Sequence, residues 1–290
     1  MSELRQALLR LNFPFCFQKC DFCKKDIVTG WDTRRLHECA LATVREIEAA
    51  AEDFADCEIA AIRLDGGDVT ALTGEDLWTL DRTVRASFSV REDAPVTLLS
   101  NPFQINGSLL AFANRIPVRR WDYEVFSTRA GDDAWLRRPD CREKLRLAGA
   151  MTHAEEEGSM GAVLVLGHPD QTPERFRRTL VDLIRTPMVH LTLWRHPAAG
   201  AAALPEEDRA LLIEAGFEEY LPGCFARPGR EDRYLSLRRA GAPVLAFGVG
   251  ARTEFDGAYS RNTTDPALYA AHSDDFRRIT VQAGPLPPDK

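Results

Sequence analysis

The chain has 290 residues and a formal charge of −7, from 37 basic and 44 acidic side chains, so its composition gives no support for nucleic-acid binding. The sequence has no apolar run of about 18 residues and no signal-peptide pattern. We therefore expect no membrane-spanning helix and a cytoplasmic location. The seven cysteines are odd in number and unpaired in pattern, which favours a reducing compartment without disulfides.

Extended and helical segments alternate along the first two thirds of the chain. Strands are expected at residues 8–13, 59–64, 96–100, 117–126, 161–166 and 189–194. Helices are expected at residues 33–54, from 73 onward, at 107–114, 142–157 and 173–184. Six strand–helix units predict an α/β fold in which a parallel sheet forms a partial (β/α)6-type barrel, and an open doubly wound sheet is the alternative.

The pattern changes after His196-Pro197. A helix at 205–216 is ended by Gly216, and a loop-rich segment, a last strand at 244–249 and a mobile polar tail are expected to follow. We therefore divide the chain into a partial barrel at 1–197, which begins with a cysteine loop, and a short C-terminal extension at 198–290.

Three cysteines follow the first expected strand at the spacing C-x3-C-x2-C: Cys16, Cys20 and Cys23. Three thiolates on one loop can hold three irons of a four-iron four-sulfur cluster and leave the fourth iron open to a small molecule. A structural zinc ion prefers four ligands in paired units, and the other four cysteines are scattered singly. The spacing therefore favours a cluster, with zinc or three buried thiols as alternatives.

With its companion motifs, this loop resembles the radical S-adenosylmethionine (SAM) superfamily, and specifically the branch typified by oxygen-independent coproporphyrinogen III oxidase. Residues 65–72 (DGGDVTAL) resemble the GGGTPT segment of that branch, and residues 167–172 (GHPDQT) resemble its GLPGQT segment. Three downstream blocks also match in order, namely residues 216–220 (GFEEY), 225–229 (FARPG) and 247–251 (FGVGA).

The resemblance implies a radical SAM barrel with a four-iron four-sulfur cluster held by the three cysteines. S-adenosyl-L-methionine would chelate the open iron, and its reductive cleavage would give a 5'-deoxyadenosyl radical that abstracts hydrogen. Phe22 occupies the position that contacts adenine in the family, or it is a core aromatic. Arg138 matches a basic position of the family, or it is a surface arginine.

Gly66 and Gly67 are expected at a strand end where the backbone comes close to a ligand's charged end, with an ordinary turn as the alternative. Asp68 stands where the family has Thr, and it either binds an amino or hydroxyl group or caps the turn.

Two departures from the family pattern bear on function. Polar family positions are occupied here by Leu99, Phe126 and Val163, so it stays open whether one or two SAM molecules bind. The family's enzymes also continue into a C-terminal domain that helps to cover the barrel mouth, whereas this chain ends soon after Ala251. A more open mouth suits a large or carrier-bound substrate, or a partner protein that closes the barrel, and argues against porphyrinogen decarboxylation.

The resemblance therefore predicts a radical SAM enzyme of the oxidoreductase or transferase type. It would act in specialised metabolism, by methyl transfer or carbon rearrangement, and would receive electrons from a donor such as flavodoxin or ferredoxin. Two alternatives remain: a non-catalytic cluster-binding or regulatory relative, for instance in haem handling, and an enzyme that cleaves a different carbon–sulfur bond of SAM.

Overall fold

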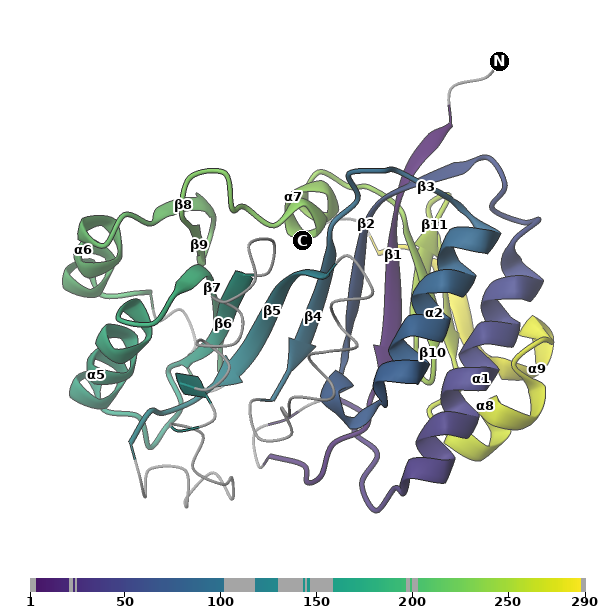
Figure 1. Cartoon of the computed structure of the whole chain (residues 1–290), viewed down its shortest axis with the longest axis horizontal. Coiled ribbons are helices and arrows are strands. Elements are labelled where there is room, and N and C mark those ends of the chain that lie inside the picture. The colour runs from purple at the N-terminus through teal and green to yellow at the C-terminus, as the bar shows by residue number, and fades with distance from the viewer. Residues whose placement is uncertain are drawn as a thin grey trace.

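One curved sheet organises the computed structural model, which describes residues 4–20, 23, 25–101, 118–129, 143, 145, 146, 159–196, 199 and 203–287 (Figure 1). Its centre holds the six predicted parallel strands in chain order: β1 (Arg5–Phe13), β2 (Cys57–Gly66), β4 (Val96–Ser100), β5 (Val118–Val125), β6 (Ser159–Leu166) and β7 (Met188–Arg195). The short β3 (Ser89–Val90) pairs only with β2. The sheet is open and does not close, so the prediction of a partial barrel is confirmed.

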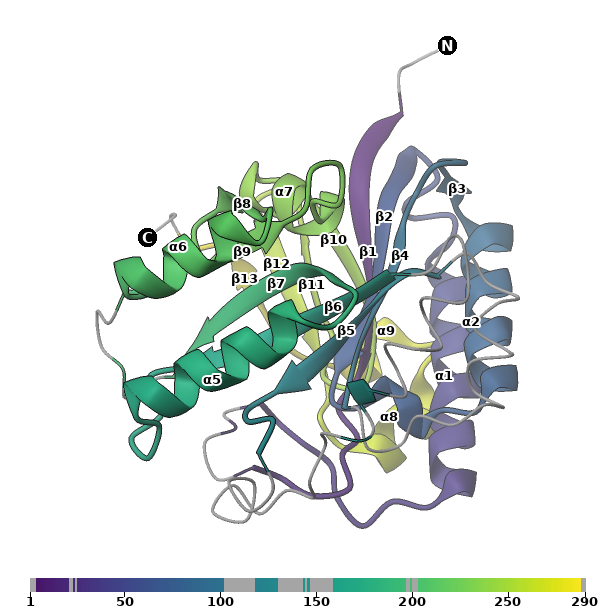
Figure 2. The same cartoon turned by 60° about the vertical axis from the view of Figure 1, so that its left-hand side comes forward.

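Helices cover the outer face of the sheet, and this explains why strand residues are mostly buried. They are α1 (Thr33–Ala50), α2 (Gly74–Ser87), α5 (Pro173–Ile184) and α6 (Glu206–Glu214). Figure 2 shows α1 and α2 on one flank and α5 and α6 on the other. Among the described residues, no helix has the length and apolarity needed to cross a bilayer.

The helix starts follow from local sequence. Thr73 caps α2 and exchanges hydrogen bonds with Asp76, and Thr172 caps α5 directly before a proline in its first turn. The helix expected at 107–114 lies outside the described residues, as does nearly all of the helix expected at 142–157.

The C-terminal extension is more regular than we expected. Beyond β7, β9 (Cys224–Ala226) and β8 (Glu218–Leu221) add antiparallel strands. On the other side, β10 (Val244–Gly248) pairs in parallel with β1 and is followed by three antiparallel strands, β11 (Arg252–Phe255), β12 (Ala258–Asn262) and β13 (Thr280–Pro285). Three short helices complete the segment: α7 (Arg233–Arg239), α8 (Pro266–His272) and α9 (Phe276–Ile279).

The prediction of a loop-rich segment was therefore wrong, and residues 280–285 of the predicted tail form a strand, while mobility of the tail stays a prediction. The β11–β12 turn is made by Asp256 and Gly257, which both have positive φ (51° and 71°), and Asp-Gly is a strong hairpin signal. β13 is held by its antiparallel pairing with β12. The boundary between residues 197 and 198 stays a prediction, although the extension supplies strands to both edges of the sheet.

Glu46 ties α1 to this extension. It is 1% exposed and accepts hydrogen bonds from the Gly248 amide (2.8 Å), the Asn262 side chain (2.6 Å) and the Tyr269 hydroxyl (2.5 Å). Burial raises the pKa of the Glu46 carboxyl from 4.5 to about 7, although all three hydrogen bonds act in the opposite direction. The folded protein thus holds a proton on Glu46 in a pH range where the unfolded chain releases it.

We expect this proton to make stability depend on pH. As the pH rises from 5 to 8, the contribution of Glu46 should lower the free energy of unfolding by about 2 to 3 kcal/mol, because the folded state must then charge a buried group. Urea unfolding at both pH values would measure this slope, and Glu46→Gln should remove it. The exposed neighbour Glu48 offers a control, since Glu48→Gln should keep the wild-type slope. An unchanged slope in Glu46→Gln would contradict the assignment.

Candidate functional site

The cysteine loop begins where β1 ends, at the carboxyl end of the parallel strands. It closes on itself through two backbone hydrogen bonds, from Val28 N to Pro14 O (2.7 Å) and from Cys16 N to Val28 O (3.1 Å). The indole nitrogen of Trp31 also donates to the Cys16 carbonyl (2.9 Å). The backbone of Cys16 is therefore fixed by Val28 and Trp31, two residues at the end of its own loop.

The end of β2 supports this loop from the side. Gly67 N donates to Phe13 O (2.7 Å), and Asp68 N donates to Phe15 O (2.8 Å). A Cβ on Gly67 would lie 2.5 Å from Phe15 O, and Gly66 has a φ of 111°. The two glycines are thus required because two chain segments touch, and their role in cofactor binding stays a prediction. Both glycines nevertheless line the cavity below the loop.

A cavity of about 430 Å³ lies between the cysteine loop and the ends of the strands, a size within the range of small-molecule sites. All three cysteines of the motif line it, together with Gly66 and Gly67. The other lining residues are Gln18, Lys19, Lys25, Ile27, Arg63, Leu99, Glu124, Phe126, Val163, Val165, Thr192 and Trp194.

The arrangement of the thiols bears on which metal group they suit. In the described part of the chain, no three His, Cys, Asp or Glu side chains are gathered so as to hold a single metal ion. A zinc ion needs its ligands to converge on one point, whereas an iron–sulfur cluster takes each thiolate on a different iron. All three thiols of the motif line one cavity, which is compatible with thiolates bound to different irons.

The loop also carries a buried donor without a partner. The Gln18 side-chain nitrogen is buried and has no hydrogen-bond acceptor among the residues that the structure describes, and Gln18 lines the cavity. Because an unpaired buried donor is costly, an occupant with an acceptor atom would satisfy it. A cluster sulfide or a ligand carboxylate has the required chemistry.

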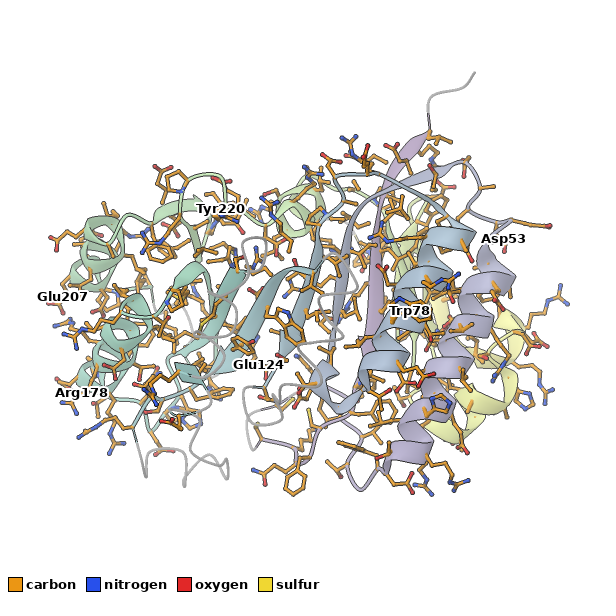
Figure 3. All side chains as sticks on the ribbon, viewed as in Figure 1. Asp53, Trp78, Glu124, Arg178, Glu207 and Tyr220 are labelled. Atoms are coloured by element: carbon orange, nitrogen blue, oxygen red, sulfur yellow. The ribbon has the colours of Figure 1, made fainter. Side chains whose placement is uncertain are left out.

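An ion pair joins the loop to the barrel wall. Lys25 Nζ lies 3.3 Å from Glu124 Oε1, at the end of β5. Figure 3 shows Glu124 near the carboxyl end of β5 and Tyr220 at the opposite end of the strands. Neither Lys25 nor Glu124 was singled out from the sequence, because the two residues are 99 positions apart.

The rest of the wall is largely apolar. Leu99, Phe126 and Val163, the three residues that replace polar family positions, all line the cavity. Phe126 and Val165 form a small apolar cluster with Trp194, separate from the main core. The substitutions recognised in the sequence are therefore gathered in one cavity.

The floor below the cavity is a buried network of alternating charges. Arg63 contacts Asp65 and Asp232 at 3.3 Å each, and Arg120 contacts Asp122 (2.6 Å) and Asp232. Burial opposes ionisation of Asp232, but Arg120 and Arg63 outweigh it and lower the pKa to about 2. Because Asp232 belongs to the C-terminal extension, that segment completes the floor of the barrel.

His190 stands at the edge of this floor, near the start of β7. Its Nε2 lies 2.8 Å from the Tyr220 hydroxyl, and burial together with Arg120 lowers its pKa to about 4. His190 is therefore neutral at physiological pH, at the opposite end of the strands from the cysteine loop.

Asp68 is the one further predicted site residue that the structure describes. Asp68 is 2% exposed, does not line the cavity, and accepts hydrogen bonds from Thr70 N (3.1 Å) and Asn101 N (3.2 Å). It caps the short helix η1 (Val69–Ala71), which favours the turn-capping alternative, and its cofactor role stays a prediction. Phe22 and Arg138 lie outside the described residues.

No family model matches the chain. Radical S-adenosyl methionine domain-containing protein 1 of Bos taurus is 27% identical over 87% of this chain, and the heme chaperone HemW of Escherichia coli is 23% identical over 91%. The solved coproporphyrinogen III oxidase (HemN) of Escherichia coli superposes with a TM-score of 0.83 at 21% identity and covers 99% of this chain.

These relatives are radical SAM proteins, which confirms the resemblance read from the motifs. More particularly, they include heme chaperones and oxygen-independent coproporphyrinogen III oxidases, and the fold is that of the latter. The chain spans 61% of the bovine relative, 75% of HemW and 73% of the solved oxidase.

Proposed function

We propose that the chain is a radical SAM enzyme in which Cys16, Cys20 and Cys23 hold a four-iron four-sulfur cluster. When bound, the cluster and S-adenosyl-L-methionine supply one-electron cleavage of a carbon–sulfur bond and a radical that abstracts hydrogen. The observation that carries the proposal is that all three thiols line one cavity with the glycine end of β2. An electron donor such as flavodoxin or ferredoxin would supply the electron.

The chain's own residues have separable tasks in this proposal. Gly66 and Gly67 leave room for the loop and expose backbone to the cavity, and the Lys25–Glu124 pair fixes the loop to β5. The apolar cluster of Phe126, Val165 and Trp194 excludes water from the cavity, which protects a reactive species from side reactions. Phe22 and Arg138 would contact the cofactor, on the strength of the resemblance. The substrate would be large or carrier-bound.

The test is product analysis after anaerobic reconstitution with iron and sulfide, followed by addition of dithionite and S-adenosyl-L-methionine. We expect 5'-deoxyadenosine to form and the triple variant of Cys16, Cys20 and Cys23 to Ala to form none, because each thiolate holds an iron. The scattered Cys39 lies in α1 and serves as a matched control, since Cys39→Ala should retain the product. Methylthioadenosine in its place would point to cleavage of the bond between the sulfur and the aminocarboxypropyl group of S-adenosyl-L-methionine.

A second candidate is a non-catalytic role in haem handling. It is favoured by the HemW relatives, whose match extends over 90–91% of this chain and which are named heme chaperones. Titration with haem would separate the two candidates. Stoichiometric haem binding by a cluster-bearing protein that forms no 5'-deoxyadenosine would support the chaperone role.

A further inference from the structure

Another cavity lies at the amino ends of β1 and β10, at the opposite end of these strands from the cysteine loop. Its volume is about 630 Å³, within the range of small-molecule sites. Four segments line it: the start of β1, the end of α7 with the connection to β10, β11 with the turn after it, and the residues that follow β13. Figure 1 shows α7 and the start of β1 at the same end of the sheet. The two cavities have no described lining residue in common.

Three arginines from different segments line this cavity, namely Arg5, Arg238 and Arg252. Their side chains are 43%, 40% and 36% exposed, so solvent reaches each of them. The Arg252 guanidinium lies 4.0 Å from the centre of the Tyr259 ring. The Arg5 guanidinium lies 4.3 Å from the centre of the Phe255 ring. A guanidinium stacked on an aromatic ring keeps a fixed plane and presents the N–H groups at its edge to an acceptor.

One carboxylate is shared by two of these arginines. Glu254 lies 2.6 Å from a terminal nitrogen of Arg238 and 2.9 Å from Nε of Arg252. Each guanidinium has five N–H donors, so these two contacts use only part of what the pair can donate. A second oxyanion could therefore bind the same two arginines, in the paired geometry that guanidinium groups form with carboxylates and phosphates.

The same cavity also has an apolar side. Ala242 and Pro243 line it from the connection before β10, and Leu286 and Pro287 line it from the residues after β13. An alkyl or aryl group placed against these residues would lose unfavourable contact with water. The cavity thus offers guanidinium donors and an apolar surface to one occupant.

We propose that this cavity is a second binding site, which takes an organic anion. Arg238 and Arg252 would hold its carboxylate or phosphate group, and its apolar body would lie against Pro243 and Leu286. The site goes beyond the proposed function, which makes no use of this end of the strands. Because its lining comes from the barrel and from the C-terminal extension, a bound ligand would connect the two and stabilise the folded chain.

The test uses four probes that separate the two parts of such a ligand. Naphthyl phosphate and naphthoate carry a ring and an anion, naphthol carries the ring alone, and inorganic phosphate is the anion alone. Equilibrium dialysis of the full chain at constant ionic strength would give the dissociation constants. We expect at least one ring-bearing anion to bind about tenfold more tightly than naphthol and inorganic phosphate. The tighter of the two would identify phosphate or carboxylate as the preferred group.

Two results with these probes would overturn the proposal. Naphthol that binds as tightly as both ring-bearing anions would show that the arginines do not contribute. Inorganic phosphate that binds as tightly as both would show that the apolar side does not contribute.

Adjacent arginines of α7 give matched variants that locate the binding. Arg238→Gln should weaken the tighter ring-bearing anion by about tenfold. Arg239→Gln should leave it unchanged, because Arg239 is exposed on the same helix and does not line the cavity. Equal binding by these two variants would refute the assignment.

A third variant should act in the opposite direction. Glu254→Gln removes the carboxylate that competes for Arg238 and Arg252, so it should tighten the ring-bearing anion by about threefold or more. Damage to the fold cannot produce tighter binding, which separates this result from a structural effect. Weaker binding by a folded Glu254→Gln chain would contradict the proposal.

These measurements require neither the cluster nor S-adenosyl-L-methionine, so they fail separately from the test of the proposed function. A chain that binds the ring-bearing anion but forms no 5'-deoxyadenosine would keep this site and lose the proposed reaction. A chain that forms 5'-deoxyadenosine but binds none of the probes would do the reverse. In the reconstituted chain, saturating S-adenosyl-L-methionine should leave the anion bound, and its displacement would show that the two sites are not separate.

Discussion

Replacement of Arg120 by methionine is expected to lower the free energy of unfolding by about 3–5 kcal/mol, because buried Asp122 loses its hydrogen-bonding arginine and buried Asp232 keeps only Arg63. Arg120 is 4% exposed and pairs with Asp122, which is fully buried, and with Asp232. Burial opposes the charge on Arg120, but Asp122 and Asp232 outweigh it and raise its pKa. Methionine fills a similar volume but cannot neutralise either acid.

Urea unfolding at neutral pH would measure this loss. The adjacent Arg119 is exposed on the same strand, so Arg119→Met should change stability by no more than about 0.5 kcal/mol. Part of the loss should be recovered at low pH, where Asp232 becomes protonated and no longer needs a countercharge. Equal stability of the two variants at neutral pH would mean that the network does not hold the floor together.

Replacement of Gly67 by alanine is expected to displace the cysteine loop and to reduce iron incorporation to a small fraction of the wild-type level. The new Cβ would lie 2.5 Å from the Phe15 carbonyl oxygen and 2.7 Å from the Phe15 amide nitrogen. Since these are backbone atoms, relief requires movement of the segment that leads directly into Cys16. Overpacking of this kind costs about 1–3 kcal/mol.

Iron and sulfide analysis after reconstitution, with thermal unfolding in parallel, would test this expectation. Gly284→Ala is the control, because the nearest atom to its Cβ would be a Tyr259 ring carbon at an ordinary 3.6 Å. Wild-type iron content in Gly67→Ala would show that the loop does not depend on its contact with β2.

Most of the six central strands could be predicted because they are short apolar runs, β5 could be predicted because apolar and charged residues alternate from Arg120 to Val125, and the cysteine loop could be predicted because its spacing is local. The hairpin at Asp256 and Gly257 also has a local signal, because Asp-Gly favours a tight turn between two strands. The outer strands β8 and β9 are too short, at 4 and 3 residues, for periodicity to reveal them.

The floor and the polar contacts of the cavity could not be predicted. Arg63, Arg120 and Asp232 stand on three segments far apart in the chain, and only the curvature of the sheet brings them together. The same holds for Lys25 and Glu124. By contrast, the apolar replacements at Leu99, Phe126 and Val163 were recognised one by one from motif positions, and the fold gathers them into one cavity.

The pairing of β1 with β10 has a consequence for synthesis on the ribosome. β2 follows β1 after one helix and can protect one of its edges early, but β10, which protects the other edge, is made only after all the strands from β2 to β9. One edge of β1 therefore stays open to wrong partners while these strands are synthesised. We expect the yield of folded protein to depend on whether a chaperone covers this edge until β10 has been synthesised.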